Sequence, residues 1–303
     1  MIAKATQMRE LTRTQRSPAE SPNLMRSSLE PRALRDVFLT VGAWLVAVVG
    51  AVPLFSVIYM LIVKGGARLS FELFTELPPA GFEQGGGIGN AIQGTLVTVA
   101  IAAIISIPIA ILAAIYLAEF RPDSRIAALA RFLSKVLTGF PSILAGVFVY
   151  AAVVLLMGSY SALAGGIALA VLMLPTITLT AEGAMRMVPQ RMKDAAIGMG
   201  CTNAEVVWHV TVPTALPSIV TGVILAVARV AGESAPLLFT ALFSNYWLRN
   251  IREPTASLSI LIYNFSSMPF ENQIELAWAA SLVLVLIVLT FNILGRFIGR
   301  PQV

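Results

Sequence analysis

Long apolar runs separated by short polar segments form the main pattern of this sequence. The first run, 37–63, has no charged residue over 27 positions, enough for a helix to cross a bilayer about 30 Å thick. The 46 uncharged residues of 136–181 are too many for one span and predict two helices joined by a turn rich in glycine and serine. The pattern therefore predicts an all-α polytopic membrane protein with six transmembrane helices: 37–63, 90–118, 141–157, 165–184, 217–243 and 276–298.

The polar segments between these runs differ in charge, which predicts the orientation of the chain. Most of the Lys and Arg residues lie in the 1–36 tail, in the 119–135 and 185–194 connections and at the C-terminus. Because cytoplasmic segments carry the excess of Lys and Arg, we expect both termini in the cytoplasm. Residues 1–36 have little hydrophobic periodicity and are expected to form a mobile basic tail, while 64–89 and 244–275 are expected to be extracytosolic.

Composition agrees with this interpretation and excludes several kinds of site. The chain has 303 residues, of which 57% are hydrophobic and 12% charged, whereas soluble proteins have about 25% charged residues. The net charge of +5 belongs to cations beside apolar runs, so membrane topology explains it better than nucleic-acid binding. With one Cys and one His in the whole sequence, we expect no metal site and no catalytic constellation.

The segment 189–216 is helix-prone and more polar than its neighbours. Pro189 followed by good helix formers predicts a short helix over 189–199, which Gly200 ends. Thr202 and Glu205 have the Ser/Thr-x-x-Glu spacing of a capping box, so a second short helix is expected to begin at Asn203 and to stop before Pro213. The two helices would form a compact projection.

The same segment resembles the EAA signature of the permease subunits of ABC importers. Asp194-Ala195-Ala196 is followed after three residues by Gly200, and Val210-Thr211-Val212-Pro213 follows after nine more residues, with Asp, Val and Val replacing Glu, Ile and Leu. The resemblance implies a coupling loop, 189–216, that docks in the ATP-hydrolysing subunit. An ordinary amphipathic cytoplasmic loop is the alternative. The expected coupling residues are Asp194, Ala195, Ala196, Gly200, Thr202, Glu205 and Pro213.

Arg229 lies near the middle of the fifth apolar run. A cation there costs about 2.5 to 3.5 kcal/mol on insertion scales, so it should face protein or water and have a partner. Glu233, one turn later, is the nearest candidate. The pair either locks helices together or forms an anion passage in which the guanidinium binds phosphate oxygens.

Two strings resemble the permeases of phosphate ABC importers: ARVAGESAPLLFTA at 228–241 and LTGFPSILAGVFVY at 137–150. The likeness runs from about residue 37 to 298 and favours the PstA type. It implies the type I ABC importer permease fold in the bacterial inner membrane, with Arg229 and Glu233 in the substrate passage. It also implies a PstC-type permease, a PstB-type ATPase dimer that binds the ATP, and a periplasmic PstS-type phosphate-binding protein as partners, with no cofactor in this chain.

Three other functions remain open on the sequence. An ABC permease for molybdate, sulfate or amino acids would share the coupling loop and differ only in its substrate. A secondary transporter or channel would not need that loop. An enzyme within the membrane would need convergent titratable groups, which the predicted spans lack apart from Arg229, Glu233 and the boundary residue Glu182.

Overall fold

The structure is a computed structural model that describes residues 31–298. Two compact units, Met1–Ile58 and Tyr59–Val303, are distinguished and are described separately. In the first unit, helix α2 extends over Pro31–Met60, because proline fits the first turn of a helix and the residues that follow are apolar. Residues 31–36 are therefore helical rather than part of the expected mobile tail. The rest of that tail, residues 1–30, lies outside the described residues.

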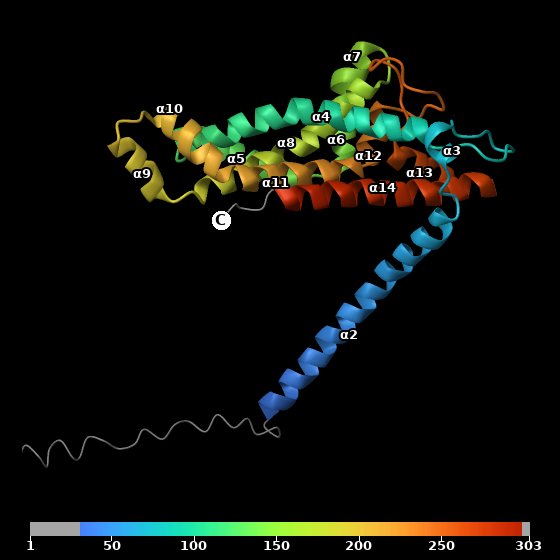
Figure 1. Cartoon of the computed structure of the whole chain (residues 1–303), viewed down its shortest axis with the longest axis horizontal. Helices are drawn as coiled ribbons and strands as arrows, with labels where there is room; N and C mark the ends of the chain where they lie inside the picture. Colours follow the sequence, from blue (N-terminus) through green and yellow to red (C-terminus); the bar gives the residue numbers. More distant parts are fainter. Residues whose placement is uncertain (1–30, 299–303) are drawn as a thin grey trace, which may run out of the picture. The chain divides into compact units, whose positions relative to one another are not determined.

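Within the described residues, the regular elements of the second unit are all helices (Figure 1). In chain order its elements, with η marking a π-helical turn, are η1 (Leu61–Gly65), α3 (Phe71–Thr75), α4 (Gly89–Ile115), η2 (Tyr116–Phe120), α5 (Arg125–Thr138), α6 (Ser142–Val149), η3 (Tyr150–Val154), α7 (Leu155–Met157), α8 (Ala162–Arg186), α9 (Gln190–Gly198), α10 (Asn203–Val206), η4 (Val207–Thr211), α11 (Val212–Ala231), α12 (Ala235–Thr240), α13 (Leu258–Ser266) and α14 (Glu271–Ile298).

Helix α8 is the centre of this unit and packs against α4, α11 and α5. Glycines allow the close approach of these helices. A Cβ atom added at Gly166 of α8 would lie 2.4 Å from Ile101 Cγ2 of α4, and one at Gly222 of α11 would lie 2.7 Å from Thr180 Oγ1 of α8. Close packing through small residues is typical of helices in membranes, where lipid removes the hydrophobic drive for association.

The helices account for the expected crossings of a membrane. Within residues 31–298, five helices are long and apolar enough to span: Arg35–Gly65, Gly89–Phe120, Ala162–Arg186, Asn203–Ala231 and Glu271–Phe297. The pair Arg125–Thr138 and Ser142–Met157 provides a sixth if its two parts, bent by 107°, form one span. Gly139 and Pro141 lie at the bend, where proline disfavours helical conformation of the residue before it.

The apolar run 217–243 is divided between two helices. Helix α11 ends at Ala231, and α12 begins at Ala235. Pro236 explains the break, because it has no N–H for the carbonyl of Gly232 and its ring would collide with that carbonyl in a continuous helix. The end of α11 therefore lies close to Arg229 rather than at residue 243.

The segment 244–275, expected to be a polar extracytosolic connection, contains a buried helix. Helix α13 packs on α14, and its residues Leu258, Ile260 and Leu261 are fully buried. Nine residues are too few to cross a membrane, so the helix packs inside the unit instead. The preceding loop is held by α4, since Gln93 Nε2 donates to Leu248 O at 3.1 Å and Leu248 N donates to Gln93 Oε1 at 3.0 Å.

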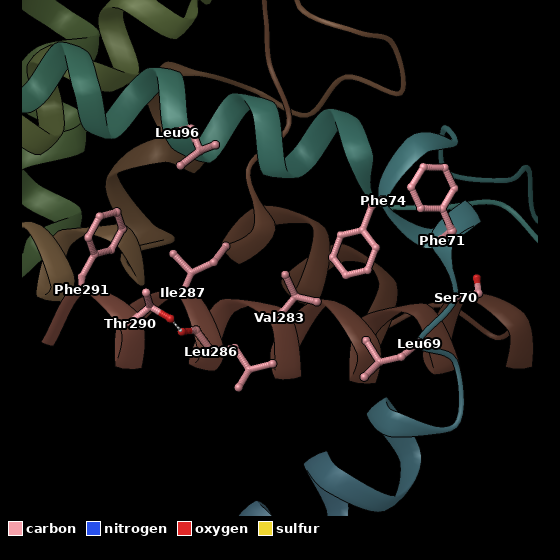
Figure 2. A pocket seen from close by; sticks show the side chains of 10 residues that line it. All are labelled: Leu69, Ser70, Phe71, Phe74, Leu96, Val283, Leu286, Ile287, Thr290 and Phe291. Atoms are coloured by element: carbon pink, nitrogen blue, oxygen red, sulfur yellow. Dashed lines mark hydrogen bonds between the residues drawn. The ribbon is translucent and has the colours of Figure 1, made fainter. Parts of the chain in front are cut away.

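An apolar groove of about 760 Å³ lies between α3, α4 and α14. Figure 2 shows Phe74, Leu96 and Ile287 directed into it from these three helices. No charged side chain lines the groove, and the Thr290 hydroxyl donates to Leu286 O of its own helix at 2.7 Å. Such a surface suits lipid acyl chains and offers nothing to an anion.

Candidate functional site

The segment 189–216, called the coupling loop after its expected role, has the first helix, the glycine turn and the helix start that its sequence predicts. Helix α9 begins after Pro189, and Gly200 turns the chain with a φ of +96°, a conformation that favours glycine. The capping box is confirmed: Glu205 N donates to Thr202 Oγ1 at 3.3 Å, and Thr202 N donates to Glu205 Oε2 at 2.7 Å. Figure 1 shows α9 and α10 together at one end of the second unit.

The second helix of the loop was expected to stop before Pro213, and this expectation is wrong. It continues from α10 through the π-helical turn η4 into α11, so that one helix extends over Asn203–Ala231. Pro213 lies in the first turn of α11, immediately after η4. Proline has no N–H to donate to the preceding turn, and the wider π-helical turn leaves room for its ring. The helix can therefore continue past Pro213. The coupling loop is thus directly joined to the helix that carries Arg229.

The EAA-like residues divide between the inside and the surface of the loop. Ala196 is buried, whereas Asp194 and Ala195 are exposed, and the Asp194 carboxylate accepts from Gln190 Nε2 at 2.9 Å. Ile197 and Met199 are also exposed, Met199 at 81%. Exposed apolar side chains grouped on a projecting loop are typical of a surface that binds another protein.

Two ion-pair sites near the coupling loop were not found from the sequence. Lys193 Nζ of α9 lies 2.5 Å from Glu119 Oε1 of η2, and both side chains are largely buried. Glu182 Oε1 of α8 lies 2.6 Å from Arg131 Nε and 2.9 Å from Arg186 Nη2. One signal was available, because Glu182 is the first charge after 46 uncharged residues and would need a partner if buried.

Arg229 and Glu233 line the same small cavity, of about 100 Å³. Its walls come from the end of α5, the start of α6, the middle of α8 and the end of α11. The cavity brings together the two strings singled out in the sequence, 137–150 and 228–241, which are far apart in the chain. The polar groups around it are the Arg229 guanidinium, the Glu233 carboxylate and the hydroxyls of Thr138, Ser142 and Thr176.

The expected pair between Arg229 and Glu233 does not form in the described part of the chain, where the ion pairs join other residues. Glu233 lies beyond the end of α11 at Ala231, so the two residues are not one turn apart on a helix face. Arg229 is exposed in this chain and Glu233 is half-buried. The backbone carbonyl of Glu233 is fixed by Ser259 Oγ at 3.0 Å. The guanidinium therefore forms no direct ion pair with its expected partner, although both groups line the same cavity.

Comparison with known proteins identifies the family. The family model for the binding-protein-dependent transport system inner membrane component matches residues 106–300. The chain is 39% identical over 242 residues to the phosphate transport system permease protein PstA of Yersinia pestis, covering 80% of this chain and 82% of that protein. It is 37% identical over 276 residues to the probable phosphate transport system permease protein PstA of Methanocaldococcus jannaschii, covering 90% and 96%.

Solved structures agree on the fold. A chain of the bacterial alginate ABC transporter matches with a TM-score of 0.64 at 14% identity, covering 90% of this chain and 97% of that one. A chain of the inward-facing MetNI methionine ABC transporter matches with a TM-score of 0.57 at 19% identity, covering 71% and 93%. The helices thus form a multi-pass membrane protein with the type I ABC importer permease fold. The chain belongs to the family of binding-protein-dependent transport system inner membrane components.

Proposed function

We propose that this chain is one of the two permease subunits, of the PstA type, of an ATP-driven importer that carries inorganic phosphate into the cytoplasm. The relatives named as phosphate transport permeases support the substrate, since their similarity covers most of the chain. The observation that carries the proposal is the cavity at Arg229, where a guanidinium without an ion-pair partner among residues 31–298 meets three hydroxyl groups.

The chemistry of this cavity suits a tetrahedral oxyanion. A guanidinium donates two parallel N–H bonds to two oxygens of one phosphate. The hydroxyls of Ser142 and Thr176 are available to donate to the others, while the Thr138 hydroxyl donates to Ser134 O at 2.8 Å. Passage also requires that the anion leaves again, so binding must be weak enough for release. Glu233 supplies the opposing charge, and its carboxylate accepts a hydrogen bond from the P–OH group that phosphate carries at neutral pH.

The coupling loop links transport to ATP hydrolysis by a partner subunit. We assign Asp194, Ala195, Ala196, Gly200, Thr202, Glu205 and Pro213 to the contact with a PstB-type ATPase dimer, which binds the ATP while this chain needs no cofactor. The continuous helix Asn203–Ala231 supports this role, because it joins the loop to the residues around Arg229. A PstC-type permease completes the passage, and a periplasmic PstS-type protein delivers phosphate. Both termini and the coupling loop face the cytoplasm in this proposal.

Uptake of labelled phosphate tests the role of Arg229. The complete importer is reconstituted in proteoliposomes with ATP and its binding protein on the appropriate sides. Arg229→Ala should lower uptake by about tenfold or more, since a hydrogen bond to a charged group contributes about 1.5 to 3 kcal/mol. Arg249→Ala, which removes an exposed loop cation, is the matched control and should keep normal uptake. Full uptake by an assembled Arg229→Ala complex would show that the passage lies elsewhere.

The substrate itself is tested by competition in the same vesicles. Unlabelled phosphate should abolish the uptake of labelled phosphate, while sulfate and molybdate at equal concentration should leave most of it. Equal competition by the three anions would favour a general oxyanion permease. Uptake without ATP would instead indicate a secondary transporter or channel.

A further inference from the structure

We propose that Lys193, Glu119, Arg131 and Glu182 form a polar relay that makes α9, α5 and α8 move together when the coupling loop is displaced. The inference rests on the proposed function, because it concerns how force on the loop reaches the cavity at Arg229. Its members come from four separate elements, α9, η2, α5 and α8, that meet at the coupling-loop end of the unit.

The first connection joins α9 to η2. Lys193 Nζ and Glu119 Oε1 are 2.5 Å apart, with exposed fractions of 12% and 11%. The two side chains line a cavity of about 310 Å³ whose other walls come from η2, from Pro122 after it, and from α9, α10 and η4. The ion pair thus joins α9 to η2 across this open space, beside a packed contact in which Val207 of η4 and Ala118 of η2 share one hydrophobic cluster.

The second connection joins η2 to α5 and α8 through one guanidinium. Arg131 Nη2 donates to Leu117 O of η2 at 2.8 Å, and Arg131 Nη1 donates to Pro122 O at 2.8 Å. Arg131 Nε donates to Glu182 Oε1 of α8 at 2.6 Å. Each nitrogen of the Arg131 guanidinium has a different partner, so this planar group holds three chain segments together. A lysine ammonium, on its flexible side chain, would hold them less rigidly.

The third connection leads from these two helices to the passage. Leu137 and Thr138, at the end of α5, and Leu172, Met173 and Thr176, on α8, line the cavity that contains Arg229. The Arg131–Glu182 bond therefore joins the two helices that form much of its wall. A displacement of α9 that pulls on Glu119 would shift α5 relative to α11 and so change the space around Arg229.

A purely structural clamp is the competing explanation, and the ratio of phosphate taken up to ATP hydrolysed separates the two. In the reconstituted complete importer, Lys193→Met removes the tie but keeps the aliphatic bulk. The relay predicts that binding-protein-stimulated ATP hydrolysis persists while phosphate carried per ATP falls by about fivefold or more, the low end of typical coupling between sites. Arg131→Lys should lower the same ratio, since it loses the fork.

Charge exchange is the rescue test. The double variant Lys193→Glu with Glu119→Lys should recover most of the ratio that each single change loses. Lys135→Ala, an exposed cation of α5 outside the relay, should leave the ratio unchanged. An unchanged ratio in Lys193→Met overturns the relay, and so does loss of ATPase binding by that variant in co-purification, since a relay acts after docking.

The same vesicles keep this outcome separate from that of the proposed function. If the wild-type importer carries another anion and no phosphate, the proposed substrate is wrong. The relay is then tested by the ratio of that anion to ATP, measured with the same variants. If the wild-type importer carries phosphate and the ratio is unchanged in all variants, only the relay is wrong.

Discussion

At the scale of single residues, the buried charges of this apolar chain differ from the charge of Arg229. Glu182 and Lys193 are largely buried and have close partners, as a charge removed from water requires. Arg229 lies in the last turn of α11 and has no such partner in the described part of the chain. A cation that has no ion-pair partner is available to bind a mobile anion.

Glu233 is expected to set the choice between phosphate and sulfate. In the proposed passage its carboxylate would accept a hydrogen bond from protonated phosphate but repel sulfate, which carries no proton at neutral pH. Glu233→Gln should therefore lower the preference for phosphate over sulfate by about tenfold, equivalent to about 1.4 kcal/mol. The measurement is inhibition of labelled phosphate uptake by increasing sulfate.

Glu253→Gln serves as the control for this prediction, because that carboxylate is exposed in the loop before α13. It should leave the inhibition curve of the wild type unchanged. If Glu233→Gln shows the same curve as well, Glu233 does not select the anion.

At the scale of elements, the coupling loop depends on local interactions more than on burial. Its turn needs Gly200 in the left-handed conformation, and its second helix begins at a capping box. Both features can be read from a few adjacent residues. The loop is therefore the part of the candidate site that sequence patterns predict best.

Loss of the capping hydroxyl should loosen the start of this helix. Thr202→Ala removes the acceptor for Glu205 N, a change that costs about 1 kcal/mol at an N-cap. We expect faster amide hydrogen exchange over 202–207, with little change in α14. Thr202→Ser keeps the hydroxyl and should exchange like the wild type; equal exchange in all three proteins would mean that packing alone holds the helix start.

Sequence patterns predict the helices that cross a membrane better than the places where these helices break. Charge-free runs gave the approximate position of α4, α8 and α14, because their length is set by the bilayer. The division at Gly232–Ser234 follows from Pro236, which a search for apolar runs overlooks. The burial of α13 depends on neighbours far along the chain, such as Thr95, whose hydroxyl accepts from Leu258 N at 2.8 Å. Hydrophobicity alone does not distinguish a short buried helix from part of a loop.

The cavity at Arg229 shows the same limit at the site. Resemblance drew attention to Arg229 and to the 137–150 string separately, but only the folded chain brings Thr138, Ser142 and Thr176 to that arginine. The partners of Glu182 and Lys193 are distant in sequence, at Arg131 and Glu119. These pairs cannot be predicted from the sequence, because no motif of fixed spacing includes both partners.

At the scale of the whole molecule, the proposed orientation can be tested through the single cysteine. Cys201 lies in the coupling loop and is partly exposed. A membrane-impermeant thiol reagent should label it in inside-out vesicles but not in intact spheroplasts. Binding of the ATPase should reduce the labelling, because the cysteine follows the Gly200 turn.

A matched control reverses the sidedness. Cys201→Ser combined with Tyr246→Cys places the thiol at an exposed position in the loop between α12 and α13, which should react in spheroplasts. Labelling of Cys201 from the outside would contradict the proposed orientation and, with it, the assignment of 189–216 as the coupling loop.

The π-helical turn η4 has a consequence for how variants of the chain should be aligned. Such a turn contains one residue more than the regular helix needs between the same hydrogen-bonded levels. Deletion of one residue from Val207–Thr211 would let the helix become regular and leave Thr202 and Glu205 in nearly their present direction relative to α11. Deletion of one residue from a regular part of the same helix would instead rotate the coupling loop by about 100° and direct it away from the ATPase.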